Sequence, residues 1–466
     1  MMFRYRKALS SVLLAGLTAL VPMGNALAAP AAIVTGAALS DDTGRMVQAH
    51  GAGITKVGDT YYMVGEDKEA GQTFTAVSCY SSKDLTSWHY EGHSLTLQAS
   101  GDLGPNRVVE RPKIIYNDTT HQYVMYFHAD DPGYQEARVG VATSPTPCGP
   151  YAYHGSFRPL GFQSRDMGLF KDDDGTAYLL TEDRANGLRI DKLSADYLSV
   201  VSSTALVGDY EAPAMVKVNG RYMLFGSQLT GWSTNDNVYA TATSPAGPWT
   251  SFSNFAPAGS QTFNSQLSTI VPVTGTQGTS YMYVGDRWQA DDLFHSPPVW
   301  LPIELDGTTA KLNWYDSWSL DAAAGTWSPQ GAAITYTAVG ALVGIGSGRC
   351  LDVPGGSTAN GILEDIWDCN GGANQQWNAT AAGELRIYGG SKCLDLLNNA
   401  TAPGSSVGIW GCNGGTNQQW TTNPDGTIVS RSSGLCLDVT NQNTANGTSV
   451  KVWTCNGGTN QQWRRN

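Results

Sequence analysis

Charged residues are scarce in this chain, and basic residues are the scarcest. Lysine and arginine together number 28 against 40 aspartates and glutamates, only 15% of the residues are charged, and the formal net charge is −12. Because nucleic acids require a basic surface, this composition argues against a nucleic-acid partner. Low charge combined with 54 glycines, 14 tryptophans and 21 tyrosines favours β structure over a mainly helical protein.

Several motifs of common catalytic and metal sites are also missing. His50, His121, His128 and His295 show no metal-ligand spacing, and the chain has neither a glycine-rich phosphate loop nor a serine-centred nucleophile elbow. The run at residues 172–175, Asp-Asp-Asp-Gly, resembles a calcium loop but fits better as the turn of a hairpin. We therefore expect neither a metal nor another cofactor.

Long apolar runs are confined to the start of the chain. Residues 8–21 are apolar, follow three basic residues, and precede Ala-Leu-Ala at residues 26–28, which suits cleavage after small residues. This order is typical of a secretory signal peptide, which we predict for residues 1–28. A membrane anchor is the alternative, but the stretch is short and is broken by a proline and a glycine. We expect a secreted, extracellular protein without a membrane partner.

The C-terminal part of the chain repeats one unit three times. The copies at residues 348–377, 391–420 and 434–463 start 43 residues apart, and each has a Cys-Leu-Asp tripeptide, a Trp two residues before a second Cys, and the ending Asn-Gln-Gln-Trp. Short strands and glycine-rich turns without a helical period predict β hairpins. One copy is too small to bury a core, so the three must close around a shared axis.

These repeats resemble the ricin-B-type β-trefoil lectin module, with its Gln-x-Trp signature. The resemblance implies a carbohydrate-binding trefoil over residues 340–466, in which an Asp accepts hydrogen bonds from sugar hydroxyls, a Trp stacks on the sugar ring and an Asn donates. The residues at these positions are Asp352, Trp367 and Asn374; Asp395, Trp410 and Asn417; and Asp438, Trp453 and Asn460. The alternative is that these residues only hold the trefoil together.

Two further features of the repeats bear on the sites. The last Trp of each copy is expected in the core; these are Trp377, Trp420 and Trp463. The position two residues before the site Trp is occupied by Asp365, Gly408 and Lys451. The glycine removes one polar contact, which puts the second site in doubt.

Eight cysteines in an exported chain suggest disulfides. The repeats explain six, as one pair within each copy; the pairs are Cys350 with Cys369, Cys393 with Cys412, and Cys436 with Cys455. Cys79 and Cys148 lie upstream, and they either pair with each other or remain buried thiols.

Upstream of the trefoil, a looser repeat is present. Five segments share a short strand, a turn rich in Gly, Asp or Asn, and an aromatic or apolar strand; they are residues 50–66, 110–128, 165–182, 211–227 and 264–288. Units of roughly 45 to 60 residues with four strands each are typical of β-propeller blades. We predict an all-β protein, with a five-bladed β-propeller over residues 32–335 followed by a β-trefoil. A β-sandwich is the alternative, but five-fold recurrence argues against it.

In a propeller, the first strand of each blade lines the central channel. The residues that begin these strands are Gly51, Glu110, Asp166, Glu211 and Gln266. Three acids that converge on one pocket repel each other, so the pKa of at least one must rise. Glycoside hydrolysis needs a carboxylic acid that stays protonated at the working pH. In a chain with sugar-binding repeats, we interpret these acids as catalytic rather than as polar strand ends.

The runs RDMGLFKDDDGTAYL and EAPAMVKVNGRYMLF resemble the inner strands of glycoside hydrolase family 43, a five-bladed propeller family with an inverting mechanism. The resemblance covers residues 40–320. It implies that Glu211 is the general acid and that Asp166 orients it and tunes its pKa. The general base of the family, an Asp in blade one, would fall within residues 51–54, where the chain has Gly-Ala-Gly-Ile. The usual base is therefore missing.

The runs VVERPKIIYND, FRPLGFQSRDMGLFKDDDG, SQLTGW and YVGDRW resemble the exo-β-1,3-galactanases of that family, which also lack this Asp. The resemblance implies that Gln266 holds the nucleophilic water. A neutral amide is a very weak base, so we expect Gln266 mainly to position the water. Glu110 is the rival base, provided that it lies about 6.5–9.5 Å from Glu211. In the resembled group, the Glu at this position binds the terminal sugar instead.

Further sugar contacts implied by the resemblance are Glu66, Tyr134, Thr230, Trp232 and Trp288, each of which could instead belong to a blade core. The predicted function is a secreted, monomeric galactan 1,3-β-galactosidase. It would release galactose from the non-reducing end of β-1,3-galactan, the backbone of arabinogalactan, with a galactan-binding trefoil. The alternatives are a family 43 α-L-arabinofuranosidase or β-xylosidase, for which the missing Asp would be expected, and a non-catalytic glycan-binding protein.

Overall fold

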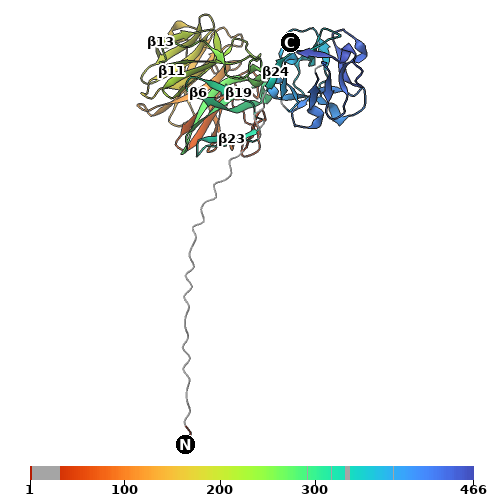
Figure 1. The fold of residues 1–466 in the computed structure, drawn as a ribbon. Helices are drawn as coiled ribbons and strands as arrows, with labels where there is room; N and C mark the ends of the chain where they lie inside the picture. Colours follow the sequence, from red (N-terminus) through yellow and green to blue (C-terminus); the bar gives the residue numbers. More distant parts are fainter. Residues whose placement is uncertain are drawn as a thin grey trace. The chain divides into compact units, whose positions relative to one another are not determined.

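The structure is a computed structural model that describes residues 1–2, 32–290, 292–315, 317–330, 336–380, 382–423 and 425–465. Apart from its first two residues, the predicted signal peptide lies outside the described residues. Most of the described elements are β-strands, and every helix among them has only three or four residues (Figure 1). Among the helices described, none is both long and apolar enough to cross a bilayer.

Five four-stranded antiparallel sheets follow one another along the chain, each with its strands in sequence order. The first is β2 (His50–Val57), β3 (Thr60–Glu66), β4 (Ala76–Ser82) and β5 (His89–Thr96); the second is β6 (Val108–Asn117), β7 (Gln122–Asp130), β8 (Arg138–Ser144) and β9 (Ala152–Phe157); the third is β10 (Met167–Lys171), β11 (Ala177–Asp183), β12 (Gly187–Leu193) and β13 (Val200–Val207). The fourth is β14 (Tyr210–Val218), β15 (Arg221–Gln228), β16 (Val238–Ala242) and β17 (Ser253–Asn254); the fifth is β18 (Gln266–Thr274), β19 (Thr279–Asp286), β20 (Pro298–Leu305) and β21 (Ala310–Leu312). Short helices in this region are η1 (Pro159–Gly161), α1 (Gln261–Asn264) and η2 (Leu293–His295).

The five sheets are the blades of a propeller, as the sequence predicts. Their first strands are neighbours in cyclic order, from β2 through β6, β10, β14 and β18 back to β2. A sixth sheet of three strands joins the two ends of this region, because β1 (Ala32–Val34) pairs with β22 (Ser317–Asp321), which pairs with β23 (Thr326–Pro329). Its residues Ile33 and Trp318 are buried in the same hydrophobic cluster as strands of the first, fourth and fifth blades.

Four of the five inner strands are irregular close to their starts. The pairing register shifts after His50, Glu110, Glu211 and Leu267. Such bulges re-aim side chains and are frequent beside functional sites. Here they lie at the channel end of the blades, where the candidate residues begin the strands.

The remaining strands form the predicted β-trefoil, which runs from cyan to blue in Figure 1. One sheet contains β24 (Tyr336–Gly340), β28 (Trp377–Thr380), β29 (Leu385–Ile387), β30 (Lys392–Leu396) and β31 (Val407–Gly411). The other contains, in spatial order, β32 (Trp420–Thr422), β33 (Ile428–Ser430), β34 (Cys436–Val439), β35 (Thr448–Trp453), β27 (Asp365–Trp367), β26 (Cys350–Asp352), β25 (Leu342–Gly344) and β36 (Trp463–Arg465). Single-turn helices between them are η3 (Pro354–Gly356), η4 (Ala373–Gln375), η5 (Tyr388–Gly390), η6 (Leu397–Asn399), η7 (Thr416–Gln418), η8 (Thr440–Gln442) and η9 (Thr459–Gln461).

The trefoil core has three-fold regularity. The last Trp of each repeat is buried, and its indole N–H donates to a leucine carbonyl 2.9–3.1 Å away; the Trp–Leu pairs are Trp377–Leu351, Trp420–Leu394 and Trp463–Leu437. These tryptophans hold the fold, as expected.

All eight cysteines form disulfides. Each trefoil repeat contains its expected bridge between residues 19 positions apart. Cys79 pairs with Cys148, which resolves the alternative that the sequence leaves open. This bridge links strand β4 of the first blade to the segment between β8 and β9 of the second.

Candidate active site

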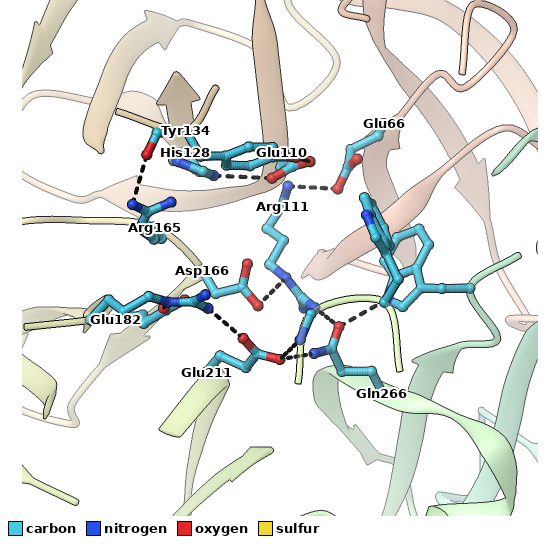
Figure 2. A pocket seen from close by; sticks show the side chains of 14 residues that line it. Glu66, Glu110, Arg111, His128, Tyr134, Arg165, Asp166, Glu182, Glu211 and Gln266 are labelled. Atoms are coloured by element: carbon cyan, nitrogen blue, oxygen red, sulfur yellow. Dashed lines mark hydrogen bonds and ion pairs between the residues drawn. The ribbon is translucent and has the colours of Figure 1, made fainter. Parts of the chain in front are cut away.

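The inner ends of the blades enclose a cavity of about 270 Å³ (Figure 2). Eight side chains predicted from the sequence line it: Glu66, Glu110, Tyr134, Asp166, Glu211, Trp232, Gln266 and Trp288. This volume lies near the lower end of the roughly 300–1,000 Å³ typical of ligand pockets. A cavity of this size suits a small group or the end of a chain better than a long internal segment.

Glu211 is buried at the centre of a dense set of partners. Its Oε1 accepts hydrogen bonds from the backbone N–H groups of Thr230 and Gly231, at 3.2 and 3.1 Å, and from Gln266. Its Oε2 pairs with Arg184 at 2.9 Å. Burial, followed by the charges of neighbouring carboxylates, raises the pKa of Glu211 to about 8, against the opposing effect of two arginines. A carboxyl group with this pKa is protonated at neutral pH and can act as a general acid.

Asp166 and Glu182 are the carboxylates that accompany Glu211. One oxygen of each of the three lies within 4.8 Å of the others. Asp166 Oδ2 accepts from the Ala212 N–H at 3.0 Å and from Arg111 Nε at 2.8 Å. Three carboxylates could in principle hold a cation, but Arg111 and Arg184 already pair with them. These two guanidinium groups offset the charge of two of the three acids.

Glu110 has different chemistry. Its Oε1 accepts a hydrogen bond from the Tyr134 hydroxyl at 2.6 Å, and its Oε2 lies 3.1 Å from Nδ1 of buried His128. Burial alone would raise the pKa of Glu110, but the His128 hydrogen bond and the charge of Lys68 outweigh it and lower this pKa to about 2. The neighbouring carboxylates in turn raise the pKa of His128 to about 9, although burial opposes this. Glu110 is thus a firmly ionised hydrogen-bond acceptor.

Gln266 uses all of its hydrogen-bonding groups. Its Nε2 donates to Glu211 Oε1 at 2.9 Å and to Ser227 Oγ at 3.1 Å. Its Oε1 accepts from Trp288 Nε1 at 2.8 Å and from the guanidinium of Arg111. The amide is therefore fixed between a carboxyl group on one side and two donors on the other.

The position of the missing base has no room for a side chain. A Cβ atom on Gly51 would lie 2.3 Å from Glu66 Oε1 and 3.2 Å from Arg111 Cα. Gly51 also has φ +56°, a left-handed conformation that favours glycine. Glu66 and Arg111 thus fill the space that an aspartate at this position would need.

The two predicted tryptophans form part of the wall of the cavity. Trp232 and Trp288 are partly exposed and meet edge to face, with ring centroids 5.2 Å apart. Their faces offer an apolar surface of the kind on which sugar rings stack. Thr230, also predicted as a sugar contact, is not among the lining residues: its hydroxyl donates to the Ser233 carbonyl, and its backbone N–H donates to Glu211.

Five charged residues of the cavity were not predicted from the sequence: Arg111, His128, Arg165, Glu182 and Arg184. Arg111 directly follows the predicted Glu110. His128 lies on the second strand of its blade and pairs with Glu110, and Glu182 lies on the second strand of the next blade, where its N–H donates to the Asp166 carbonyl. In an antiparallel hairpin, the end of the second strand lies beside the start of the first. Residues at the ends of the second strands could therefore have been predicted as cavity residues.

The three predicted sugar sites of the trefoil share one geometry. In each, the Asp Oδ2 accepts from the Asn and from the following Gln at 2.7–3.0 Å; the sets are Asp352 with Asn374 and Gln375, Asp395 with Asn417 and Gln418, and Asp438 with Asn460 and Gln461. The site tryptophans Trp367, Trp410 and Trp453 are 44–49% exposed. Each repeat therefore presents an exposed indole and a carboxylate that two side-chain amides hold in place.

Comparison with known proteins agrees with this arrangement. Residues 48–267 match Glycosyl hydrolases family 43, and residues 338–463 match the Ricin-type beta-trefoil lectin domain. The exo-β-1,3-galactanase from Clostridium thermocellum is 36% identical, with a TM-score of 0.63 over 93% of this chain and 99% of that chain. The exo-β-1,3-galactanase from Phanerochaete chrysosporium, solved with galactose, is 39% identical, with a TM-score of 0.63 over 69% and 78%. A putative exo-β-1,3-galactanase from Bifidobacterium bifidum s17 is 40% identical, with a TM-score of 0.59 over 62% and 97%.

Proposed function

Because this chain belongs to glycosyl hydrolases family 43, we propose that its propeller releases galactose from the non-reducing end of β-1,3-galactan, the backbone of arabinogalactan. The observation that carries the proposal is the buried Glu211, whose raised pKa makes it an acid at neutral pH, inside a small cavity. The similar exo-β-1,3-galactanases supply the substrate class.

In the proposed reaction, Glu211 gives its proton to the glycosidic oxygen as the bond to the leaving sugar breaks. Asp166 keeps that proton in place by its negative charge. Gln266 positions the water that attacks from the opposite face, which inverts the configuration of the released galactose. Glu110 and Glu66 accept hydrogen bonds from hydroxyls of the terminal sugar.

Two observations favour Gln266 over Glu110 as the group that holds the water. Glu110 is a firmly ionised acceptor held by Tyr134 and His128, which suits the binding of sugar hydroxyls. Gln266 is anchored on one side by Arg111 and Trp288, so it keeps its place.

Substrate binding must separate Gln266 from Glu211. The 2.9 Å between Gln266 Nε2 and Glu211 Oε1 is far shorter than the roughly 6.5–9.5 Å between acid and base in inverting glycosidases.

The proposed acid is tested by Glu211→Gln. This variant should retain the fold and lose about 10²–10⁴-fold in galactan hydrolysis, with a smaller loss on an aryl galactoside whose leaving group needs no proton. Proton NMR of the first product should show the α-anomer; initial β-anomer would contradict the single-displacement mechanism. Activity on aryl α-L-arabinofuranosides or β-xylosides that exceeds activity on β-1,3-galactobiose would contradict the substrate.

The trefoil is proposed to hold the enzyme on the polymer through several weak sites acting together. In an affinity gel containing β-1,3-galactan, the full chain with Glu211→Gln should be retarded. Replacing Trp367, Trp410 and Trp453 together with Ala should abolish the retardation while leaving hydrolysis of β-1,3-galactobiose intact. Unchanged retardation would show that the sites lie elsewhere.

We further propose that the enzyme acts outside the cell as a monomer. Four disulfides favour an oxidising compartment. Fractionation of the producing cells and the mass of the purified protein in solution test these two points.

A further inference from the structure

Arg111 is a buried cation at the axis of the propeller, with a side chain only 4% exposed. Its guanidinium makes three contacts. Nε pairs with Asp166 Oδ2 at 2.8 Å and Nη2 donates to Gln266 Oε1 (Figure 2), while Nη1 donates to the Leu267 carbonyl at 2.9 Å. Its backbone N–H donates to Glu66 Oε1 at 2.8 Å. All three nitrogens of the planar guanidinium have a partner, so the orientation of this group is fixed.

The contact with Gln266 matters because an amide side chain has two ends of similar shape and opposite polarity. In the observed orientation, the oxygen faces two donors, Arg111 and Trp288, and the nitrogen faces two acceptors, Glu211 and Ser227. Turning the amide over would place its N–H groups against a guanidinium and an indole N–H, which are both donors only.

The opposite side of the amide cannot enforce this orientation during catalysis. The Ser227 hydroxyl can donate as well as accept, and Glu211, once protonated, can also donate. Both would then tolerate the amide oxygen in place of the nitrogen. Arginine has no accessible neutral form, so its preference for the oxygen persists at every working pH.

We propose that Arg111 is a positioning residue that locks the Gln266 amide with its nitrogen toward Glu211. The same rigid guanidinium contacts both the Gln266 amide and Asp166, so it fixes their positions relative to each other. The inference rests on the proposed function, because it assigns Arg111 an effect on turnover that is exerted through Gln266.

The alternative role for Arg111 is to balance the charge of the surrounding acids. Arg111→Lys separates the two roles, since lysine keeps the charge but cannot supply three donors in a planar fork. If positioning matters, this variant should lose on the order of 10²-fold in kcat on β-1,3-galactobiose. Its KM and the alkaline limb of its pH profile should stay close to those of the wild type. Wild-type kcat in a folded Arg111→Lys variant would overturn the proposal.

Arg138→Lys, at a 42% exposed ion pair, is the matched control and should behave as wild type.

A double-substitution cycle shows whether Arg111 acts through Gln266. Adding Arg111→Lys to Gln266→Ala should produce little further loss of kcat, measured with a fluorogenic aryl β-galactoside, because the side chain to be oriented is already absent. The same loss of kcat in both backgrounds would mean that Arg111 acts independently of Gln266, and the proposal would fail.

Neutron diffraction from the unsubstituted enzyme tests the orientation itself, whatever the stability of the variants. Deuterium atoms on the Gln266 amide are expected to point toward Glu211 and Ser227. Deuterium atoms facing Arg111 would overturn the inference. If the wild type does not cleave β-1,3-galactobiose but the deuterium atoms lie as expected, the substrate assignment is wrong and the lock on Gln266 stands.

Discussion

Replacing Asp166 with Asn tests whether that residue sets the pKa of Glu211. The substitution keeps the shape of the side chain and removes one negative charge, of which the nearest oxygen lies within 4.8 Å of a Glu211 oxygen. At that distance, two unit charges interact by about 0.9 kcal/mol at a dielectric constant of 80 and by about 3.5 kcal/mol at an effective value of 20. One pKa unit corresponds to about 1.4 kcal/mol, so the pKa of Glu211 should fall by about 0.6 to 2.5 pH units.

The sign of the effect follows from the role of Glu211. The general acid is active only while protonated, so lowering its pKa moves the alkaline limb of the pH profile toward lower pH. In this variant, Arg111 loses the negative charge of its partner Asp166. Its positive charge then acts more strongly on Glu211 and lowers the pKa of Glu211 further. The assay is kcat/KM on β-1,3-galactobiose from acid to alkaline pH. Asp173→Asn, at an 85% exposed carboxylate, is the control and should leave the profile unchanged. An alkaline limb at the wild-type position in the Asp166→Asn variant would refute the reasoning.

Two more predictions concern the missing base. Gln266→Ala should lower kcat by at least about 10²-fold, because the water loses its position, whereas Glu110→Gln should mainly raise KM; steady-state kinetics on β-1,3-galactobiose distinguish the two, and the reverse pattern would make Glu110 the base. Gly51→Asp should not supply the base that the family usually has, because its Cβ would lie 2.3 Å from Glu66 Oε1. We expect lower thermal stability and lower activity in that variant, measured by calorimetry and galactose release; a gain in kcat would show that the site can accommodate the carboxylate.

The sequence alone predicts the architecture well because its landmarks are local. A tryptophan, a cysteine pair and an Asn-Gln-Gln-Trp ending recur at a fixed period, and blade hairpins repeat a recognisable pattern of turn and aromatic strand. The residues that begin the inner strands, such as Glu211 and Gln266, follow from that pattern, since propeller geometry places strand starts at the axis.

What the sequence does not reveal are the partners of these residues. Glu182 comes from a second strand, and Arg111 enters the cavity only because the bulge after Glu110 breaks the regular alternation of strand β6. An alternating pattern assigns every second residue to one face, so a bulge makes such an assignment fail locally. The proximity of Glu182 to Asp166 and the fork of Arg111 therefore had to be observed in three dimensions.

The small sheet that joins the ends of the propeller region has a consequence for the order of folding. Ile33 of strand β1 pairs with Trp318 of strand β22. The hydrogen bonds of β1 therefore cannot form before β22 is present. A contact between such distant points of the chain forms late, because the entropy of closing the intervening loop opposes it. The blades can form one by one, but the sheet that joins the two ends of the propeller region needs the chain through residue 321. Until then, strand β1 has no strand to pair with.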